Sequence, residues 1–224
     1  SLTEKLNTDN CDIIAIPAGL QPRAALAFSI VPMLFLLRAQ GLIGDSIFND
    51  ISNTVKLLRV HRDEYAKEVA SNLTYTLAVS IYKTLPIIYG TSESTAVAAL
   101  RWKGQFCENA DMLAYHNELP EMNHNEIAGW ENNAELFDNM SVLWLTDSND
   151  HDQVQLRQKI TKRIIGMKNN NQHVVAVAGS SVRVRLLHLI HFGDWVSYWC
   201  AILHGTDPSP VVPIMLLKEE LSSK

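Results

Sequence analysis

The spacing of apolar residues in the first part of this 224-residue chain predicts helices. A short β-branched run, Asp12 to Ile16, comes first and predicts a strand that nearby prolines and a glycine end. A helical pattern follows from about Arg23 to Gln40, and Gly41 ends it. After a polar stretch from Gly44 to Asn53, apolar residues recur at steps of four. They predict one long helix that ends before Leu85-Pro86: Tyr65, Val69, Leu73, Leu77 and Ile81.

Strand patterns alternate with helix patterns in the second part of the chain. The expected strands are short and largely apolar: Ile87 to Tyr89, Leu113 to Tyr115, Val142 to Leu145 and His173 to Ala178. The expected helices are Thr95 to Ala110, Asp152 to Lys168, a long one from Gly179-Ser180-Ser181 to about His204, and Pro210 to Leu221. This alternation is typical of a parallel sheet covered on both faces. The fold class is therefore α/β, a doubly wound parallel sheet preceded by a helical segment.

Composition excludes several classes of protein. The formal net charge of -5, with no visible basic stripe, argues against a nucleic-acid partner. The most apolar segment, Ala24 to Leu37, is shorter than the roughly 20 residues of a membrane-spanning helix, so no membrane partner is expected and the segment predicts a buried core helix. Cys11, Cys107 and Cys200 are odd in number and far apart, which favours a reducing compartment such as the cytoplasm over a disulfide framework.

Polar and titratable side chains crowd the stretch from Glu108 to Trp130. Each of them would need a partner if it were buried in a core, so the stretch predicts an active-site wall. Glu108, near the end of a helix pattern, is either a general base or a solvated glutamate. His124, between two asparagines and after Pro120, is expected one turn into a helix. It would serve there as a neutral proton relay or as a capping or surface histidine.

Other polar groups have competing interpretations. The spacing of His116, Glu118, His124 and Glu126 matches no metal motif, so no metal is expected. His188 and His191 share an apolar helix face and predict satisfied core histidines. The loop from Thr91 to Thr95 is either an anion nest, which Glu93 would oppose, or a set of helix caps. Gly179-Ser180-Ser181 is a weaker signal of the same kind.

Two cations near helix patterns also have two interpretations each. Arg23, at the start of an apolar helix, is either a surface group or a buried anion partner. Lys218, beside Glu219 and Glu220 in the last helix, is either a solvated lysine or a functional one.

Five segments resemble one family. They are I-P-A-G-L-Q-P-R-A-A-L at Ile16 to Leu26, R-W-K-G-Q-F-C-E-N-A at Arg101 to Ala110, N-E-L-P-E-M-N-H-N-E-I-A-G-W at Asn117 to Trp130, G-D-W-V-S-Y-W at Gly193 to Trp199, and D-P-S-P-V at Asp207 to Val211. In this order they resemble the bifunctional phosphoglucose/phosphomannose isomerases. These enzymes belong to the sugar isomerase (SIS) domain class of the phosphoglucose isomerase superfamily.

The resemblance implies a division of the chain. Members of the family have two SIS domains, and a serine- and threonine-rich loop in the first one grips the sugar phosphate. Residues 1–84 would be the end of the first SIS domain and a helical linker, and residues 85–224 the C-terminal SIS domain with its last helix. The chain is expected to be the C-terminal portion of a family member and to be inactive alone.

The resemblance also implies site residues and partners. Arg23 would stabilise an enediolate, Glu108 would be the base, and His124 and Lys218 would open the sugar ring. Substrate contacts would come from Asn109, Asn123 and, less clearly than the others because Val211 competes, Ser209. The substrate would be a phosphorylated hexose, with no metal and no organic cofactor, and a homodimer would place His124 across the interface.

Two other functions remain open at this point. One is a SIS-type module that binds a sugar phosphate without turnover, and the other is a dimerisation domain. The sequence does not decide between glucose 6-phosphate and mannose 6-phosphate.

Overall fold

The computed structural model describes residues 12–223. The chain forms two compact units, Ser1–Ile51 and Ser52–Lys224. Of the three cysteines, Cys11 lies outside the described residues, whereas Cys107 and Cys200 are free thiols, half-buried and buried respectively. None of the helices in the described part of the chain has the length and apolar character needed to cross a bilayer.

The first unit is helical. A 3-10 turn, η1 (Pro22–Ala24), precedes α2 (Leu26–Ala39), and Gly41 follows with a φ of 71° that permits the turn into α3 (Ser46–Tyr65). Phe35 and Phe48 pack edge to face with ring centroids 5.2 Å apart. The bounds of α2 lie within the stretch, from about Arg23 to Gln40, for which the apolar spacing predicts a helix.

Two expectations for this first unit are wrong. Residues 12–17 have no regular secondary structure, because no described strand lies beside them to complete a ladder. Helix α2 contains no buried residue in the described structure, so it is not a core helix, and Phe28, Met33 and Phe35 are about half exposed. The apolar pattern indicated a helix, but it could not show whether other parts of the chain pack against that helix.

The predicted long helix is broken into α3 and α4 (Leu73–Ile81). The side chain of Asn72 makes the break. Its amide nitrogen donates to the carbonyls of Tyr65 (2.7 Å) and Lys67 (2.8 Å), and its oxygen accepts from the Thr74 nitrogen (3.0 Å). One asparagine therefore satisfies the end of one helix and caps the start of the next.

The sheet of the second unit is parallel throughout, as predicted. Its strands are β1 (Leu85–Thr91), β2 (Tyr115–Leu119), β3 (Met140–Leu145) and β4 (Gln172–Val175), in the order β2-β1-β3-β4. Strand β2 begins where its predicted segment ends. It is an edge strand with a polar sequence, Y-H-N-E-L, which has no run of apolar residues to indicate a strand.

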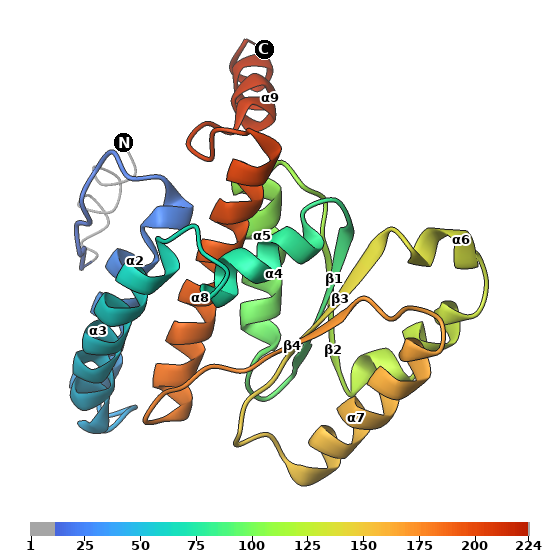
Figure 1. The fold of residues 1–224 in the computed structure, drawn as a ribbon. Coiled ribbons are helices and arrows are strands. Elements are labelled where there is room, and N and C mark those ends of the chain that lie inside the picture. Colours follow the sequence, from blue (N-terminus) through green and yellow to red (C-terminus); the bar gives the residue numbers. More distant parts are fainter. Residues whose placement is uncertain (1–11, 224) are drawn as a thin grey trace. The chain divides into compact units, whose positions relative to one another are not determined.

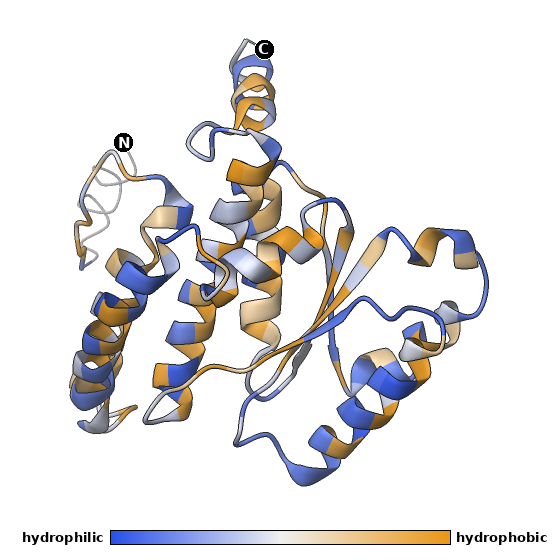
Figure 2. Cartoon of the chain, in the orientation of Figure 1, coloured by the Kyte–Doolittle hydropathy of each residue, from blue (hydrophilic) through white to orange (hydrophobic). Residues whose placement is uncertain are grey.

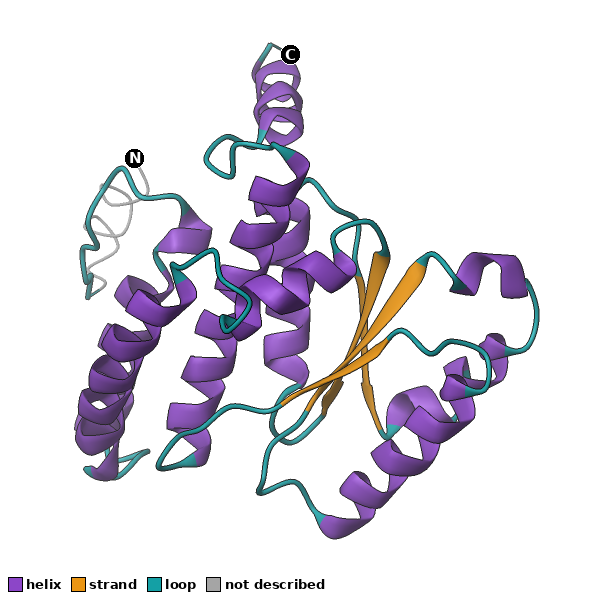
Figure 3. Ribbon diagram, in the orientation of Figure 1, coloured by secondary structure: helices purple, strands orange, loops and turns teal. Residues whose placement is uncertain are grey.

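Helices cover both faces of this sheet, which makes the fold doubly wound (Figures 1 and 3). Helices α4, α5 (Ala96–Asn109) and α8 (Val182–His204) lie on one face, and α7 (Asp152–Gly166) lies on the other. The short elements η2 (Glu121–Asn123), η3 (Glu126–Trp130) and α6 (Ala134–Phe137) follow β2, and α9 (Val212–Ser222) ends the described chain. Strand order reverses between β1 and β3, the place where open α/β sheets bind ligands.

The core has two layers, one on each side of the sheet. Tyr89 and Trp144 point to the α7 face and pack there with Met122, Trp130 and Ile165. Because side chains alternate along a strand, Ile88 and Leu143 point to the α5 and α8 face, and both are fully buried. Figure 2 shows apolar ribbon in the central strands and both hydrophilic and apolar residues along α7.

Helices α5 and α8 approach each other closely at Gly193. A Cβ placed there would lie 2.0 Å from the indole nitrogen of Trp102. That indole donates to the Leu189 carbonyl (3.0 Å), and Arg101 forms an ion pair with Asp194 (2.9 Å) in the next turn of α8. The middle of α5 is thereby fixed against α8.

Candidate active site

Glu108 and Asn109 occupy the last turn of α5. Glu108 is half-buried. Asn109 donates from Nδ2 to the hydroxyl of Ser197 on α8 (2.9 Å), and that hydroxyl donates to the Asp194 carbonyl (2.8 Å). The glutamate is therefore carried by a helix end that is hydrogen-bonded to its neighbour, which suits a group that must hold a defined position.

His124 lies in a loop beyond the carboxyl end of β2. The bond Leu119-Pro120 is cis, and the three residues of η2 follow it. His124 is the C-terminal cap of η2, where its backbone nitrogen donates to the Glu121 carbonyl, and its side chain is exposed. The expected position one turn into a helix is wrong, because the helix after Pro120 is only three residues long.

Asn123 precedes His124 and faces the protein. Its Nδ2 donates to the Thr161 hydroxyl on α7 (2.8 Å), whereas its Oδ1 is buried without a partner among the described residues. Asn123 thus ties the His124 loop to α7.

Glu108 and His124 of one chain lie on opposite faces of the sheet. Helix α5 follows β1 and packs back along β1 and β2, so its last turn reaches the edge where the strands begin. His124 follows the end of β2, and its neighbours place its loop on the other face of the sheet. Asn123 is bonded to Thr161 on α7, and Met122 belongs to the α7 core. One chain does not bring both side chains to adjacent carbons of one sugar.

Ser209 and Lys218 follow the end of α8. Ser209 is exposed, and its backbone nitrogen donates to Asp207 Oδ1 (2.8 Å). Lys218 is exposed on α9, a helix in which no residue is buried and which extends beyond the end of α8 (Figure 1). Both lie after the C-terminus of α8, on the side of the sheet edge that Glu108 occupies.

Arg23 lies in η1, in the first unit, and is half-buried. The structure describes it by itself and does not place it relative to the residues of the second unit. Its role stays a prediction.

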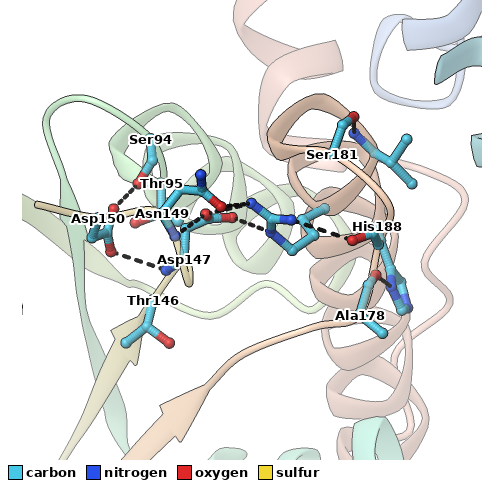
Figure 4. Close-up of polar contacts among 12 residues, drawn as sticks. Ser94, Thr95, Thr146, Asp147, Asn149, Asp150, Ala178, Ser181 and His188 are labelled. Carbon is cyan, nitrogen blue, oxygen red and sulfur yellow. Dashed lines mark hydrogen bonds and ion pairs between the residues drawn. The ribbon is translucent and has the colours of Figure 1, made fainter.

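An internal carboxylate occupies the loop after β1 (Figure 4). The hydroxyls of Thr91 (2.8 Å) and Ser94 (2.5 Å) donate to Asp150 Oδ1, and the Asp147 nitrogen donates to Asp150 Oδ2 (2.9 Å). The Thr95 hydroxyl accepts from the Thr91 nitrogen and donates to the Leu145 carbonyl, and it does not cap α5. The loop therefore binds an anion, as one of the two interpretations predicts, but the anion is the protein's own side chain.

Asp147 beside it is also paired (Figure 4). Arg185 donates from Nε and Nη2 to its two oxygens, each at 2.8 Å, and Nη2 also donates to Asn149 (2.7 Å). These bonds from Arg185 hold the pKa of Asp147 below its ordinary value. Ser181 caps α8 by accepting from the Val184 nitrogen (3.2 Å), so the Gly179-Ser180-Ser181 segment acts as a helix start.

Histidines on α8 are satisfied by protein groups. His188 is buried, its Nδ1 donates to the Ala178 carbonyl (2.8 Å), and its Nε2 accepts from the Tyr65 hydroxyl (2.9 Å). His191 accepts from the Trp195 indole (3.2 Å). The prediction of a satisfied core histidine is confirmed for His188, whereas His191 is only half-buried. Among residues 12–223, no group of three His, Cys, Asp or Glu side chains is placed to hold a metal ion.

Sequence reasoning missed two carboxylates. Asp150 drew no attention because it follows a different strand from the loop it completes. Glu126 entered only as part of a rejected metal pattern, although its carboxylate receives hydrogen bonds from β1 and β2. The available signal was its place directly after Asn123-His124-Asn125.

The second unit matches a known family of domains. The model described as "Bacterial phospho-glucose isomerase C-terminal SIS domain" matches residues 70–221. Among solved structures, a glucose-6-phosphate isomerase like protein from Thermus thermophilus has a TM-score of 0.66 at 19% identity, covering 85% of this chain and 60% of that one. A glucosamine-6-phosphate deaminase from Thermotoga maritima has a TM-score of 0.55 at 13% identity, with coverage of 84% and 54%. These likenesses show the SIS fold.

Curated relatives are more similar in sequence and longer. A bifunctional phosphoglucose/phosphomannose isomerase from Caldicellulosiruptor bescii is 41% identical over 223 residues, which are 99% of this chain and 66% of the relative. One from Aquifex aeolicus is 38% identical over 220 residues, with coverage of 98% and 64%. The chain thus spans just under two thirds of the length of the curated relatives it matches.

Proposed function

The chain belongs to the family of bacterial phosphoglucose isomerase C-terminal SIS domains, and we propose that it works as the C-terminal part of an aldose-ketose isomerase. The substrates are fructose 6-phosphate and glucose 6-phosphate or mannose 6-phosphate. The two aldoses differ only at C2, the carbon that loses its proton, so one enediol serves both. The printed names of the relatives support this choice of substrates.

The observation that carries the proposal is the placement of Glu108 and His124 on opposite faces of one sheet. A site that needs both is completed by a second subunit, whose His124 joins the first subunit's Glu108. The exposed position of His124 suits such a contribution across an interface. A homodimer is therefore part of the proposed function.

Glu108 acts as the general base. Its carboxylate takes the proton from C2 of the open-chain aldose, and C1 and C2 become an enediolate with the negative charge on O1. The proton of the C2 hydroxyl passes to O1, the carboxylic acid of Glu108 returns its proton to C1, and C2 becomes the ketose carbonyl. Arg23 offsets the negative charge of the enediolate. Asn109, held by Ser197, keeps the end of α5 in place during both transfers.

Ring opening precedes these steps. It needs a proton removed from the anomeric hydroxyl and a proton given to the ring oxygen, which are acid-base tasks for His124 and Lys218. Asn123 orients the loop of His124 through Thr161, and Ser209 contacts the substrate near the last helix. No step requires a metal or an organic cofactor.

The phosphate is held outside this chain. The loop after β1, which resembles a phosphate-binding site, is occupied by the Asp150 carboxylate. The sugar phosphate is therefore bound by the preceding SIS domain of the longer protein. Residues 1–84 then contain the end of that domain and a linker, and residues 85–224 the C-terminal domain. The free thiols of Cys107 and Cys200 suit a cytoplasmic enzyme.

A turnover assay tests the proposal. The longer protein that contains this chain should interconvert fructose 6-phosphate with both aldoses, whereas this chain alone should not. A second candidate is a module that binds sugar phosphate without turnover. Binding without exchange of the C2 proton with solvent would favour that candidate, and absence of binding and turnover in the longer protein would reduce the chain to a dimerisation domain.

A further inference from the structure

We propose that Glu126 is a positioning residue for His124, since its carboxylate fastens the loop that carries the histidine to the edge of the sheet. The inference presupposes the proposed role of His124 in ring opening. Glu126 is two residues from His124, and its backbone nitrogen donates to the Asn125 side chain (2.6 Å) at the start of η3.

Three donors from the sheet converge on this one carboxylate. The Tyr89 hydroxyl on β1 donates to Oε1 (2.5 Å). On β2, the Tyr115 hydroxyl (3.3 Å) and the Asn117 amide nitrogen donate to Oε2. An ionised carboxylate has only acceptor sites, so it matches three donors in a way that no amide does.

The direction of the Tyr89 hydrogen bond is fixed by Trp130. The Trp130 indole, at the other end of η3, donates to the Tyr89 oxygen (3.2 Å), which leaves the hydroxyl proton free for Glu126. Burial, and then the charge of Glu126, raise the pKa of Tyr89, so the hydroxyl keeps its proton. The two ends of η3 are therefore held by the same tyrosine.

The loop is fastened on both sides of the histidine. Met122, two residues before His124, is fully buried in the core on the α7 face. Glu126, two residues after it, is bound to the sheet. An exposed side chain between two such anchors can reach into a neighbouring subunit and still have a defined position, which proton transfer requires.

The Glu126→Gln substitution tests this role in the longer protein. The amide group would direct two hydrogens toward the three donors, so the loop would shift. The matched control is Glu121→Gln, which removes the same charge three residues before His124. Glu121 is exposed, and within residues 12–223 its carboxylate receives only a 3.4 Å contact from Asn125. Turnover of both variants is measured with fructose 6-phosphate and with an analogue that lacks the hydroxyl needed for ring closure.

Glu126→Gln should lower kcat on the cyclic sugar by roughly 10- to 100-fold, the order of loss that a misplaced group causes. KM should change less than kcat, the open-chain analogue should be turned over nearly normally, and Glu121→Gln should behave as the parent. In a background of His124→Ala, Glu126→Gln should cause no further loss, because both changes remove the same function.

A second variant keeps the test decisive if Glu126→Gln fails to fold. Tyr115→Phe removes one donor from a side chain that is 45% exposed, so the fold should persist. Tyr115→Phe should lower kcat on the cyclic sugar by roughly 3-fold, which corresponds to the loss of one hydrogen bond, and should leave turnover of the open-chain analogue nearly normal.

Equal losses on both substrates, or full additivity with His124→Ala in either variant, would overturn the role of Glu126 and show a general structural effect. Normal ring opening by the His124→Ala protein would instead overturn the proposed function of the histidine. The two failures are thus separate.

Discussion

The side-chain nitrogen of Asn109 lies 2.9 Å from the hydroxyl oxygen of Ser197, and this hydrogen bond joins the last turn of α5 to α8. Glu108 is the residue directly before Asn109. The candidate base thus lies on a helix end that its neighbour joins to α8, and Glu108→Gln, which keeps the size of the side chain, should leave the fold intact.

Glu108→Gln should abolish isomerisation by the longer protein. The amide keeps the shape of the side chain but cannot accept the C2 proton, and a general base contributes roughly 10²- to 10⁴-fold. Steady-state turnover measures the loss of isomerisation, and circular dichroism checks that the fold is intact. Glu135→Gln, an exposed change on α6, is the control. Near-parental turnover of the Glu108→Gln protein would exclude Glu108 as the base.

His124→Ala should impair the reaction of cyclic sugars more than that of an open-chain analogue. Its proposed task is ring opening, which the analogue does not require. Rates on the two substrates, measured with one preparation of protein, give the comparison an internal control. Equal losses would indicate a binding or structural role for the histidine.

This chain alone should bind fructose 6-phosphate poorly and turn it over negligibly. Charge-assisted phosphate contacts contribute about 1.5–3 kcal/mol each, and the hydroxyls that could supply them in the loop after β1 are bonded to Asp150. Calorimetry should find a Kd weaker than about 1 mM. Micromolar binding would show that this unit carries its own phosphate site.

Gly193→Ala should destabilise the second unit by about 1–3 kcal/mol, the usual cost of overpacking. Helix propensity alone favours alanine by about 1 kcal/mol, so the sign of the change distinguishes packing from propensity. Urea denaturation measures it. Gly104→Ala, on α5, is the control, because an added Cβ there meets nothing within 4 Å. A stabilised Gly193→Ala protein would contradict the close approach to Trp102.

The second unit should lose stability in mild acid. Burial, and then the neighbouring His188 and His61, lower the pKa of His191 from 6.5 to about 4. The unfolded chain therefore binds a proton more readily than the folded chain, and the free energy of unfolding falls as the pH drops from 6.5 toward 4. At pH 5 the protonation of His191 in the unfolded chain lowers the free energy of unfolding by roughly 1–2 kcal/mol relative to neutral pH.

His191→Gln should flatten that part of the pH profile. Urea denaturation between about pH 7.5 and pH 5 compares the parent and the variant. His188 also has a lowered pKa, because it is buried, and it keeps its own contribution in the variant, so some pH dependence should remain. Identical slopes for both proteins would show that His191 does not titrate as described.

The sequence predicted the elements whose burial or ends are evident from their own residues. Strands β1 and β3 are apolar and buried, and α8 begins at the Ser181 cap, so local pattern and tertiary structure agree. The break between α3 and α4 was missed because it depends on where one side chain, Asn72, donates its hydrogens. A periodic pattern carries no such information.

The residues of the candidate site were predicted mainly from segments that resemble a family, and only partly from the physical chemistry of the residues. Composition drew attention to Glu108 and His124, yet spacing along the chain could not show that they lie on opposite faces of the sheet. The partners of Glu126 and Asp150 lie on other strands, so only the folded chain shows them. Residues whose role is a long-range contact have no local signature.

Asp150 can be viewed as a ligand that is permanently attached to its receptor. A group held by its own backbone has an effective concentration of millimolar or more, even with a flexible connection. A dissolved phosphate compound of similar intrinsic affinity would have to exceed that concentration to displace the carboxylate from Thr91 and Ser94. At ordinary metabolite concentrations, this loop would then not compete for sugar phosphates with the site of the proposed function.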